Sequence, residues 1–116
     1  LMASYHQCLT GDFHDFIGYL EQSLKDGSSS LEIVDKQNTI INDVECFILI
    51  CERYSLLNNS WVSMNITILH YQEKIELFAI TAGGSTGLLR IDGYGEDTFL
   101  RTLIEPVEDY IRFQND

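Results

Sequence analysis

A glycine-rich run, Gly83-Gly84-Ser85-Thr86-Gly87, is the segment that most resembles a ligand-binding motif. Glycine tolerates positive φ and lets the backbone approach a ligand closely, so such a run can bind an anion through its N–H groups. A phosphate-binding loop, however, is followed directly by a helix and usually contains a lysine. Here Leu88 to Asp92 follow with the pattern of a strand, and the glycine spacing fits neither the dinucleotide-binding nor the P-loop motif. We therefore interpret the run as a strand break or a bulge at the sheet edge.

Histidine and aspartate side chains near the N-terminus have the chemistry to bind a divalent metal. They are His6, Asp12, His14 and Asp15. His14 and Asp15 are neighbours on a predicted helix, so their side chains diverge by roughly 100°. Asp12 and Asp15 already have a sufficient role in stabilising the start of that helix. We therefore expect no metal site and no cofactor.

The three cysteines, Cys8, Cys46 and Cys51, are odd in number and form no Cys-x-x-Cys pair. Cys46 and Cys51 are an odd number of residues apart in a predicted strand, so they point to opposite faces. We expect all three to be buried, reduced thiols rather than a disulfide, a metal site or a nucleophile. Reduced thiols are typical of the cytoplasm, where we expect the protein to be.

A second candidate site combines a strand end that carries charged and aromatic residues with the glycine run. Glu52-Arg53-Tyr54-Ser55 has a composition that can line the mouth of a pocket, although a solvated strand end is the simpler interpretation. A ligand between the sheet and the last helix would contact Tyr54, Gly83, Gly84, Ser85 and Arg90. An enzyme acting on a small molecule there is the alternative to a non-enzymatic binding protein. No Gly-x-Ser-x-Gly or spaced Cys/His pattern identifies a catalytic residue.

The chain is strongly acidic, with 18 acidic and 7 basic residues and a net charge of −11. The basic residues are scattered singly, whereas a nucleic-acid backbone binds clustered lysines and arginines. The same charge repels an anionic membrane surface, and no apolar run approaches the ~20 residues that span a bilayer. We therefore expect neither nucleic acid nor membrane as a partner. The first residues lack a basic start and an apolar run, so we expect no secretory signal, with Met2 as the natural start and Leu1 as a leftover of cloning.

The hydrophobic periodicity predicts a single α+β domain over residues 1–116. Apolar stripes of period 3.6 predict helices at about 12–26 and 96–113, and the second should bend at Pro106 because proline lacks a backbone N–H. Alternation of period 2 predicts strands between them, with turns at Asn42-Asp43 and Gln72-Glu73 and a less clear pattern over 31–41. We expect one mainly antiparallel sheet of five or six strands and two helices, in the order β-α-β-β-β-β(β)-α.

One face of this sheet is expected to lack a cover, because two helices in this element order normally share the other face. With Gln72-Glu73 as the turn, three cross-strand pairs fall on the uncovered face: Thr67 with Phe78, Asn65 with Ile80, and Leu69 with Glu76. Strand 44–53 is apolar on both faces, and we expect it to contribute Phe47 and Leu49 to the uncovered face.

An exposed apolar face of this kind usually marks an interaction site. We expect a homodimer, the commonest solution, with an interface that includes Trp61, Leu69, Phe78 and Ile80. A small apolar ligand or a segment of another protein is the other kind of partner that the pattern allows. Both interpretations describe a non-enzymatic binding or interaction protein.

Three blocks of sequence resemble a family of small uncharacterised proteins from Gram-positive bacteria. They are Glu52–Ser55, Ala79–Ser85 and Tyr94–Leu100, and the resemblance extends over nearly the whole chain in element order. It implies no function and no functional residues. The element order is also similar to the TATA-binding-protein-like and helix-grip architecture, in which a curved antiparallel sheet wraps a long C-terminal helix, in some members around a ligand cavity. The acidic charge argues against the DNA-binding branch.

Overall fold

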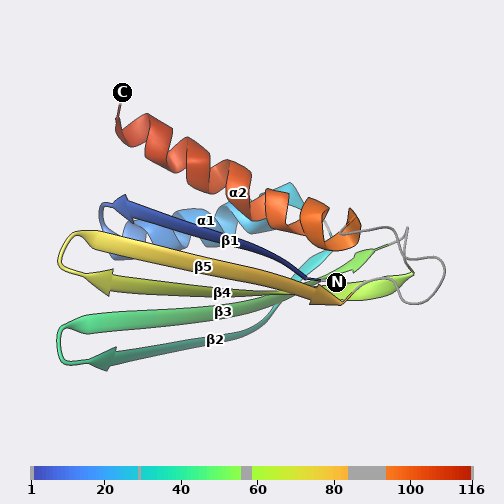
Figure 1. Ribbon diagram of the computed structural model, residues 1–116, viewed down its shortest axis with the longest axis horizontal. Helices are drawn as coiled ribbons and strands as arrows, with labels where there is room; N and C mark the ends of the chain where they lie inside the picture. The colour runs from blue at the N-terminus through green and yellow to red at the C-terminus, as the bar shows by residue number, and fades with distance from the viewer. Residues whose placement is uncertain (1, 29, 56–58, 84–93, 116) are drawn as a thin grey trace.

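A computed structural model describes residues 2–28, 30–55, 59–83 and 94–115 of the chain. It contains five strands and two helices in an α+β arrangement (Figure 1). In chain order they are β1 (Met2–Thr10), α1 (Phe13–Gly27), β2 (Leu31–Ile41), β3 (Val44–Ser55), β4 (Ser60–Tyr71), β5 (Lys74–Gly83) and α2 (Tyr94–Gln114). The predicted fold class is thus confirmed, and both helices agree with their predicted ranges to within two residues. A sixth strand at Leu88–Asp92 would lie outside the described residues.

Helix α1 forms where the sequence combines a capping residue with an apolar stripe. The Asp12 side chain accepts a hydrogen bond from the Asp15 backbone N–H at 2.9 Å, which satisfies one of the free donors at the helix start. The buried residues of the helix recur with helical period: Phe13, Phe16, Leu20 and Leu24. This confirms the capping role that the sequence assigns to Asp12.

The sheet is fully antiparallel, with the strand order β1-β5-β4-β3-β2. Two-residue turns join β2 to β3 and β4 to β5, and their first residues, Asn42 and Gln72, both have φ of 55°. Positive φ at this position matches the twist of a hairpin. All three predicted cross-strand pairs of the β4–β5 hairpin are confirmed.

Both helices pack on the same face of the sheet, which we call the inner face. In Figure 1, α1 passes behind the strands and α2 runs beside β1. The inner-face residues of β3, β4 and β5 form one core with the stripes of the two helices. Phe99, Leu103 and Val107 of α2 have no exposed surface. Neither described helix is long and apolar enough to cross a membrane.

The predicted bend of α2 at Pro106 remains a prediction. Pro106 lies inside the helix, and its carbonyl oxygen accepts a hydrogen bond from the Tyr19 hydroxyl at 2.8 Å. This bond attaches α2 to α1 at the proline, whereas the helical hydrogen bond that the proline removes would have ended on the Thr102 carbonyl, one turn earlier.

The orientation predicted for β3 is wrong. Phe47 and Leu49 are buried on the inner face, because the register pairs them with Ile68 and Ile66 of β4, whose side chains fill the core. The other face of the sheet instead receives Cys46, Ile48 and Ile50. A strand that is apolar on both faces gives no internal signal of its orientation, so the pairing with β4 decides it.

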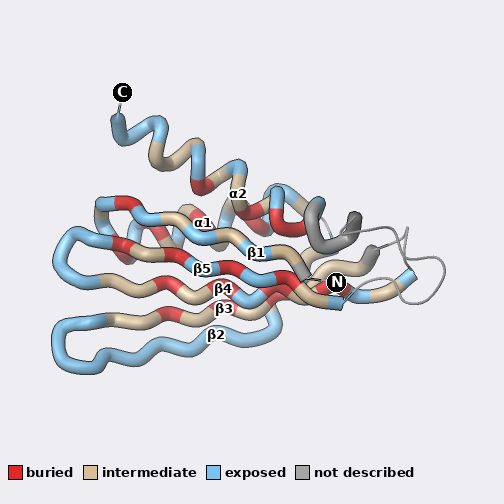
Figure 2. Tube along the Cα trace, in the orientation of Figure 1, coloured by how far each residue is buried: buried red, intermediate tan, exposed pale blue. Residues whose placement is uncertain are grey.

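Strand β2 is an edge strand whose side chains are exposed over most of its length (Figure 2). Its register shifts between Ile33 and Asp35, so that Val34 has no partner on β3 and is 54% exposed. Such a bulge shifts the alternation by one residue. This shift and the exposure explain why the sequence pattern of 31–41 is unclear.

Candidate functional site

The outer face, the side of the sheet opposite to both helices, is the surface on which the predicted interface residues lie. It carries a group of half-buried and exposed apolar side chains that we call the apolar patch: Cys46, Ile48, Ile50, Leu69, Phe78 and Ile80. Phe78 and Ile80 are 37% and 48% exposed. Trp61 and Tyr71, at the two ends of β4, point to the same face. All four predicted interface residues, Trp61, Leu69, Phe78 and Ile80, therefore lie on the outer face.

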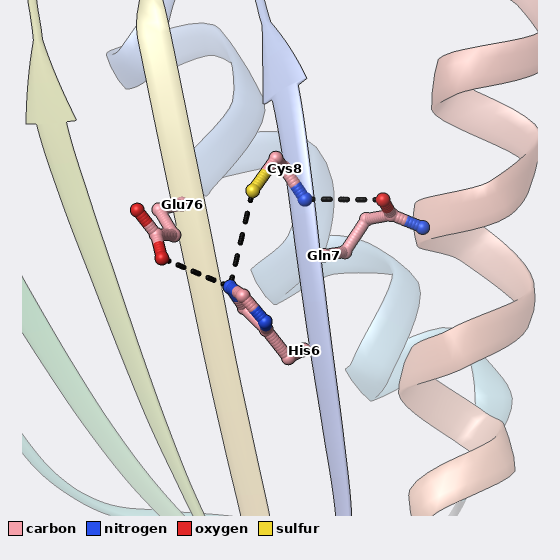
Figure 3. A network of polar contacts seen from close by, with 4 residues as sticks. All are labelled: His6, Gln7, Cys8 and Glu76. Atoms are coloured by element: carbon pink, nitrogen blue, oxygen red, sulfur yellow. Dashed lines mark hydrogen bonds and ion pairs between the residues drawn. The ribbon is translucent and has the colours of Figure 1, made fainter.

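A polar cluster of His6, Cys8 and Glu76 borders the apolar patch on the β1 side (Figure 3). His6 and Cys8 are two residues apart on β1, so they share a face, and Glu76 of β5 lies opposite Cys8. The Nε2 atom of His6 is 2.9 Å from Oε1 of Glu76 and 3.8 Å from Sγ of Cys8. The His6 ring stacks on Phe78 with its centroid 4.5 Å away and the planes 4° apart.

A shallow hollow of about 580 Å³ lies next to this cluster, at the end of the sheet that holds the β4–β5 turn. Cys8 and Glu76 line it, which places the hollow beside the polar cluster. Its other outer-face lining residues are Thr10, Val44, Leu69, Tyr71 and Lys74. The hollow therefore joins polar ligand atoms on one side to apolar side chains on the other.

Of the ligand site predicted near the glycine run, the structure describes two residues, Tyr54 and Gly83. Tyr54 lies on the outer face, donates a hydrogen bond to the side-chain oxygen of Asn59, and meets Trp61 edge-on at 5.6 Å. Gly83 ends β5 with φ of +102°, and a Cβ atom there would lie 2.8 Å from the Trp61 carbonyl oxygen. Gly83 thus has a structural reason to be glycine. Gly84, Ser85 and Arg90 lie outside the described residues.

Arg53, which the sequence places at the same strand end, connects β3 to α2. Its guanidinium lies 4.7 Å from the centroid of the Phe99 ring and donates hydrogen bonds to the hydroxyls of Thr98 and Thr102, at 2.9 and 3.4 Å. Burial lowers the pKa of Arg53 from its ordinary value. These contacts account for the arginine by packing and hydrogen bonding within the fold.

The cysteines differ in their surroundings. All three are free, and Cys46 and Cys51 point to opposite faces as predicted. Cys51 is buried in the core, and the burial raises the pKa of its thiol to about 12. Cys46 is half-buried, whereas Cys8 is exposed, so the prediction that every thiol is buried is wrong. Cys8 lies on edge strand β1, whose outer face nothing in the described structure covers.

The cluster of His6, Cys8 and Glu76 was not among the sites predicted from the sequence. The His-x-Cys spacing in a predicted strand was an available signal, because it puts both side chains on one face. Glu76 could not be joined to them, since it is 70 positions from His6 and the pairing of β1 with β5 is non-local. The structure does not bring together the four candidate metal ligands named from the sequence. Among the described residues, no group of ligand atoms combines His6 with Asp12, His14 and Asp15.

The family model of DUF6054, a family of unknown function, matches residues 2–111 of the chain. The chain belongs to this family. That finding confirms the expected resemblance to a family of uncharacterised proteins. No curated protein matches the chain. Among solved structures, the chain resembles the crystal structure of major latex-like protein 151 from Panax ginseng, with 9% identity, 96% of this chain and 98% of that chain covered, and a TM-score of 0.32. We draw no conclusion about this chain from a similarity with so low a TM-score.

Proposed function

We propose that this DUF6054 protein is a non-enzymatic interaction module that forms a two-fold symmetric homodimer through the outer face of its sheet. The observation that carries the proposal is that both helices pack on the inner face, while the apolar patch on the outer face has no cover among the described residues. Exposed apolar side chains gathered on one face are characteristic of interaction surfaces.

The size of the outer face fits a dimer. Five strands spaced about 4.8 Å apart, with about nine paired residues each, give a surface of about 24 by 30 Å, or about 700 Å². A standard protein interface buries about 800 Å² on each partner. One sheet face is therefore close to the area that a stable dimer needs.

The distribution of charge on the outer face favours a second copy as the occupant. The centre of the face consists of Ile48, Ile50, Asn65, Thr67, Phe78 and Ile80, which carry no charge. The charged outer-face side chains lie around this centre: Glu32, Asp35, Glu52, Lys74 and Glu76. A two-fold axis through the centre brings apolar residues together and leaves the acidic side chains in water at the rim.

The experiment compares two phenylalanines that are both exposed but lie on different surfaces. Phe78→Lys places a charge in the apolar patch, and Phe113→Lys places one on α2, where Phe113 is 63% exposed. Light scattering coupled to size exclusion should give a dimer for the wild type and for Phe113→Lys, and a monomer for Phe78→Lys. Ile80→Lys should also be monomeric, and its circular dichroism should remain that of the wild type.

Two results would contradict the proposed dimer. One is a wild type that is monomeric at tens of micromolar. The other is a dimer that Phe113→Lys disrupts and both outer-face variants leave intact, because the interface would then involve the helices.

Binding of a small apolar ligand is a second candidate function, favoured by the hollow beside Leu69 and Tyr71. Its volume of about 580 Å³ falls within the usual range for ligand pockets. Gently purified protein should then carry a co-purified molecule that native mass spectrometry detects and that Leu69→Lys removes. An enzyme site between the sheet and α2 is less favoured, because Phe99, Leu103 and Val107 fill that space.

A further inference from the structure

We propose that His6, Cys8 and Glu76 form a zinc site on the outer face, with a fourth coordination position directed to the adjacent hollow. The cluster supplies one imidazole nitrogen, one thiol sulfur and one carboxylate oxygen, all within 4.8 Å of one another. These are the three ligand types that zinc takes in proteins. Hard cations such as calcium and magnesium prefer oxygen ligands only, so the thiol and imidazole select zinc over them.

Two of the three distances between ligand atoms in the cluster are within about 0.5 Å of those in a tetrahedral site. Zinc bonds of about 2.0–2.3 Å place neighbouring ligand atoms about 3.4 Å apart. The Nε2 atom of His6 is 3.8 Å from Sγ of Cys8 and 2.9 Å from Oε1 of Glu76. Sγ of Cys8 and the carboxylate oxygen of Glu76 lie within 4.8 Å of each other. Zinc binding therefore requires the Glu76 carboxylate to rotate until its oxygen is about 3.4 Å from both Nε2 and Sγ, and the side chain is 44% exposed, which leaves room for that rotation.

The fold holds two of the three ligands in place before a metal binds. Stacking on Phe78 fixes the His6 ring. The Cys8 backbone N–H donates a hydrogen bond to the side-chain oxygen of Gln7 at 3.0 Å, and the amide of Gln7 donates to Glu108 of α2 at 2.9 Å. These bonds anchor β1 at the residue that carries the thiol. Less conformational freedom is then lost when the metal binds, which favours binding.

Charge also favours a cation at this position. Glu76 is paired with His6, and the described residues form no ion pair between Glu76 and a lysine or arginine. The chain as a whole carries a net charge of −11, which attracts cations to its surface. Three protein ligands and an open fourth position are typical of a zinc ion that can still bind water or a ligand group. Cys8 and Glu76 line the hollow, so a ligand there would be within reach of the metal.

Cobalt binding tests the site, because cobalt(II) commonly replaces zinc and gives a charge-transfer absorption band when a thiolate coordinates it. Reduced, untagged protein is titrated with cobalt and then with zinc. We expect one cobalt ion per chain with a thiolate band, and loss of the band when zinc displaces cobalt. Cys8→Ser should abolish the band, and His6→Ala and Glu76→Gln should each weaken zinc binding at least tenfold, as measured by competition with a chromophoric chelator.

The matched controls use residues of the same types outside the cluster. Cys46→Ser removes the other thiol of the outer face, and His14→Ala removes a histidine whose side chain is 78% exposed. Both variants should bind cobalt and zinc like the wild type. The proposal is overturned if the wild type binds no stoichiometric zinc, or if Cys46→Ser reduces the thiolate band as much as Cys8→Ser does.

The metal site and the dimer are tested separately. Ile80→Lys should make the protein monomeric while leaving His6, Cys8, Glu76 and the stacked Phe78 in place. Zinc binding by this variant that equals the wild type supports a site contained in one chain. Loss of zinc binding in folded Ile80→Lys protein would contradict that arrangement, whatever the oligomeric state of the wild type.

Discussion

Replacing Leu103 by alanine should show whether α2 is an essential part of the core. Leu103 has no exposed surface, and its neighbours on the same stripe, Phe99 and Val107, are equally buried. The change removes three carbon atoms, worth about 0.8 kcal/mol each, or about 2.4 kcal/mol of apolar burial. The cavity that remains adds to this loss, so the free energy of unfolding should fall by about 3–4 kcal/mol.

Urea unfolding followed by circular dichroism measures this loss. With a denaturant dependence of about 1–3 kcal/mol per molar, the midpoint should fall by about 1–4 M urea. Phe113→Ala on the same helix is the control and should shift the midpoint little, because Phe113 is 63% exposed. All samples need the same protein concentration, since a dimer is stabilised by mass action. An unchanged midpoint for Leu103→Ala would refute the argument, because α2 would then be peripheral to the core.

Three further predictions follow from particular contacts. Gly83→Ala should lower the free energy of unfolding by about 1–3 kcal/mol, because φ is +102° and a Cβ atom would collide with a β4 carbonyl; an unchanged urea midpoint would contradict this. Burial and the hydrogen bond to Glu108 raise the pKa of Tyr5 to about 12, so the folded state holds this proton more tightly than the unfolded state. The stability contributed by Tyr5 should be complete below about pH 10 and lost as the pH rises to about 12, and Glu108→Gln should lower the Tyr5 pKa in an absorbance titration. A thiol reagent at neutral pH should modify Cys8 quickly and Cys51 only after unfolding, because burial raises the Cys51 pKa to about 12; equal rates in the folded protein would contradict the structure.

The sequence predicted the elements whose pattern is local. The apolar stripe of α1 and its Asp12 cap lie within a few residues of one another, and the β4–β5 register follows from its two-residue turn. The inner and outer residues of β4 and β5 could therefore be assigned before the fold was known.

What depends on non-local pairing could not be predicted in the same way. Strand β3 is apolar on both faces, so only its pairing with β4 shows that Phe47 and Leu49 point inward. The cluster of His6, Cys8 and Glu76 depends on β1 joining the sheet beside β5, a contact between residues that are 70 positions apart in the sequence. Alternation along β1 is thus enough to put His6 and Cys8 on one face, whereas the position of Glu76 beside them follows only from the strand order.

The molar mass of the wild-type protein in solution tests the central claim most directly. Sedimentation equilibrium over a dilution series should give twice the chain mass of 13.3 kDa at tens of micromolar, with a decline toward 13.3 kDa on dilution. In parallel, Phe78→Lys should stay at 13.3 kDa throughout. A wild type that has the mass of one chain at every concentration would contradict the account, because the outer face would then remain exposed to water without a second copy.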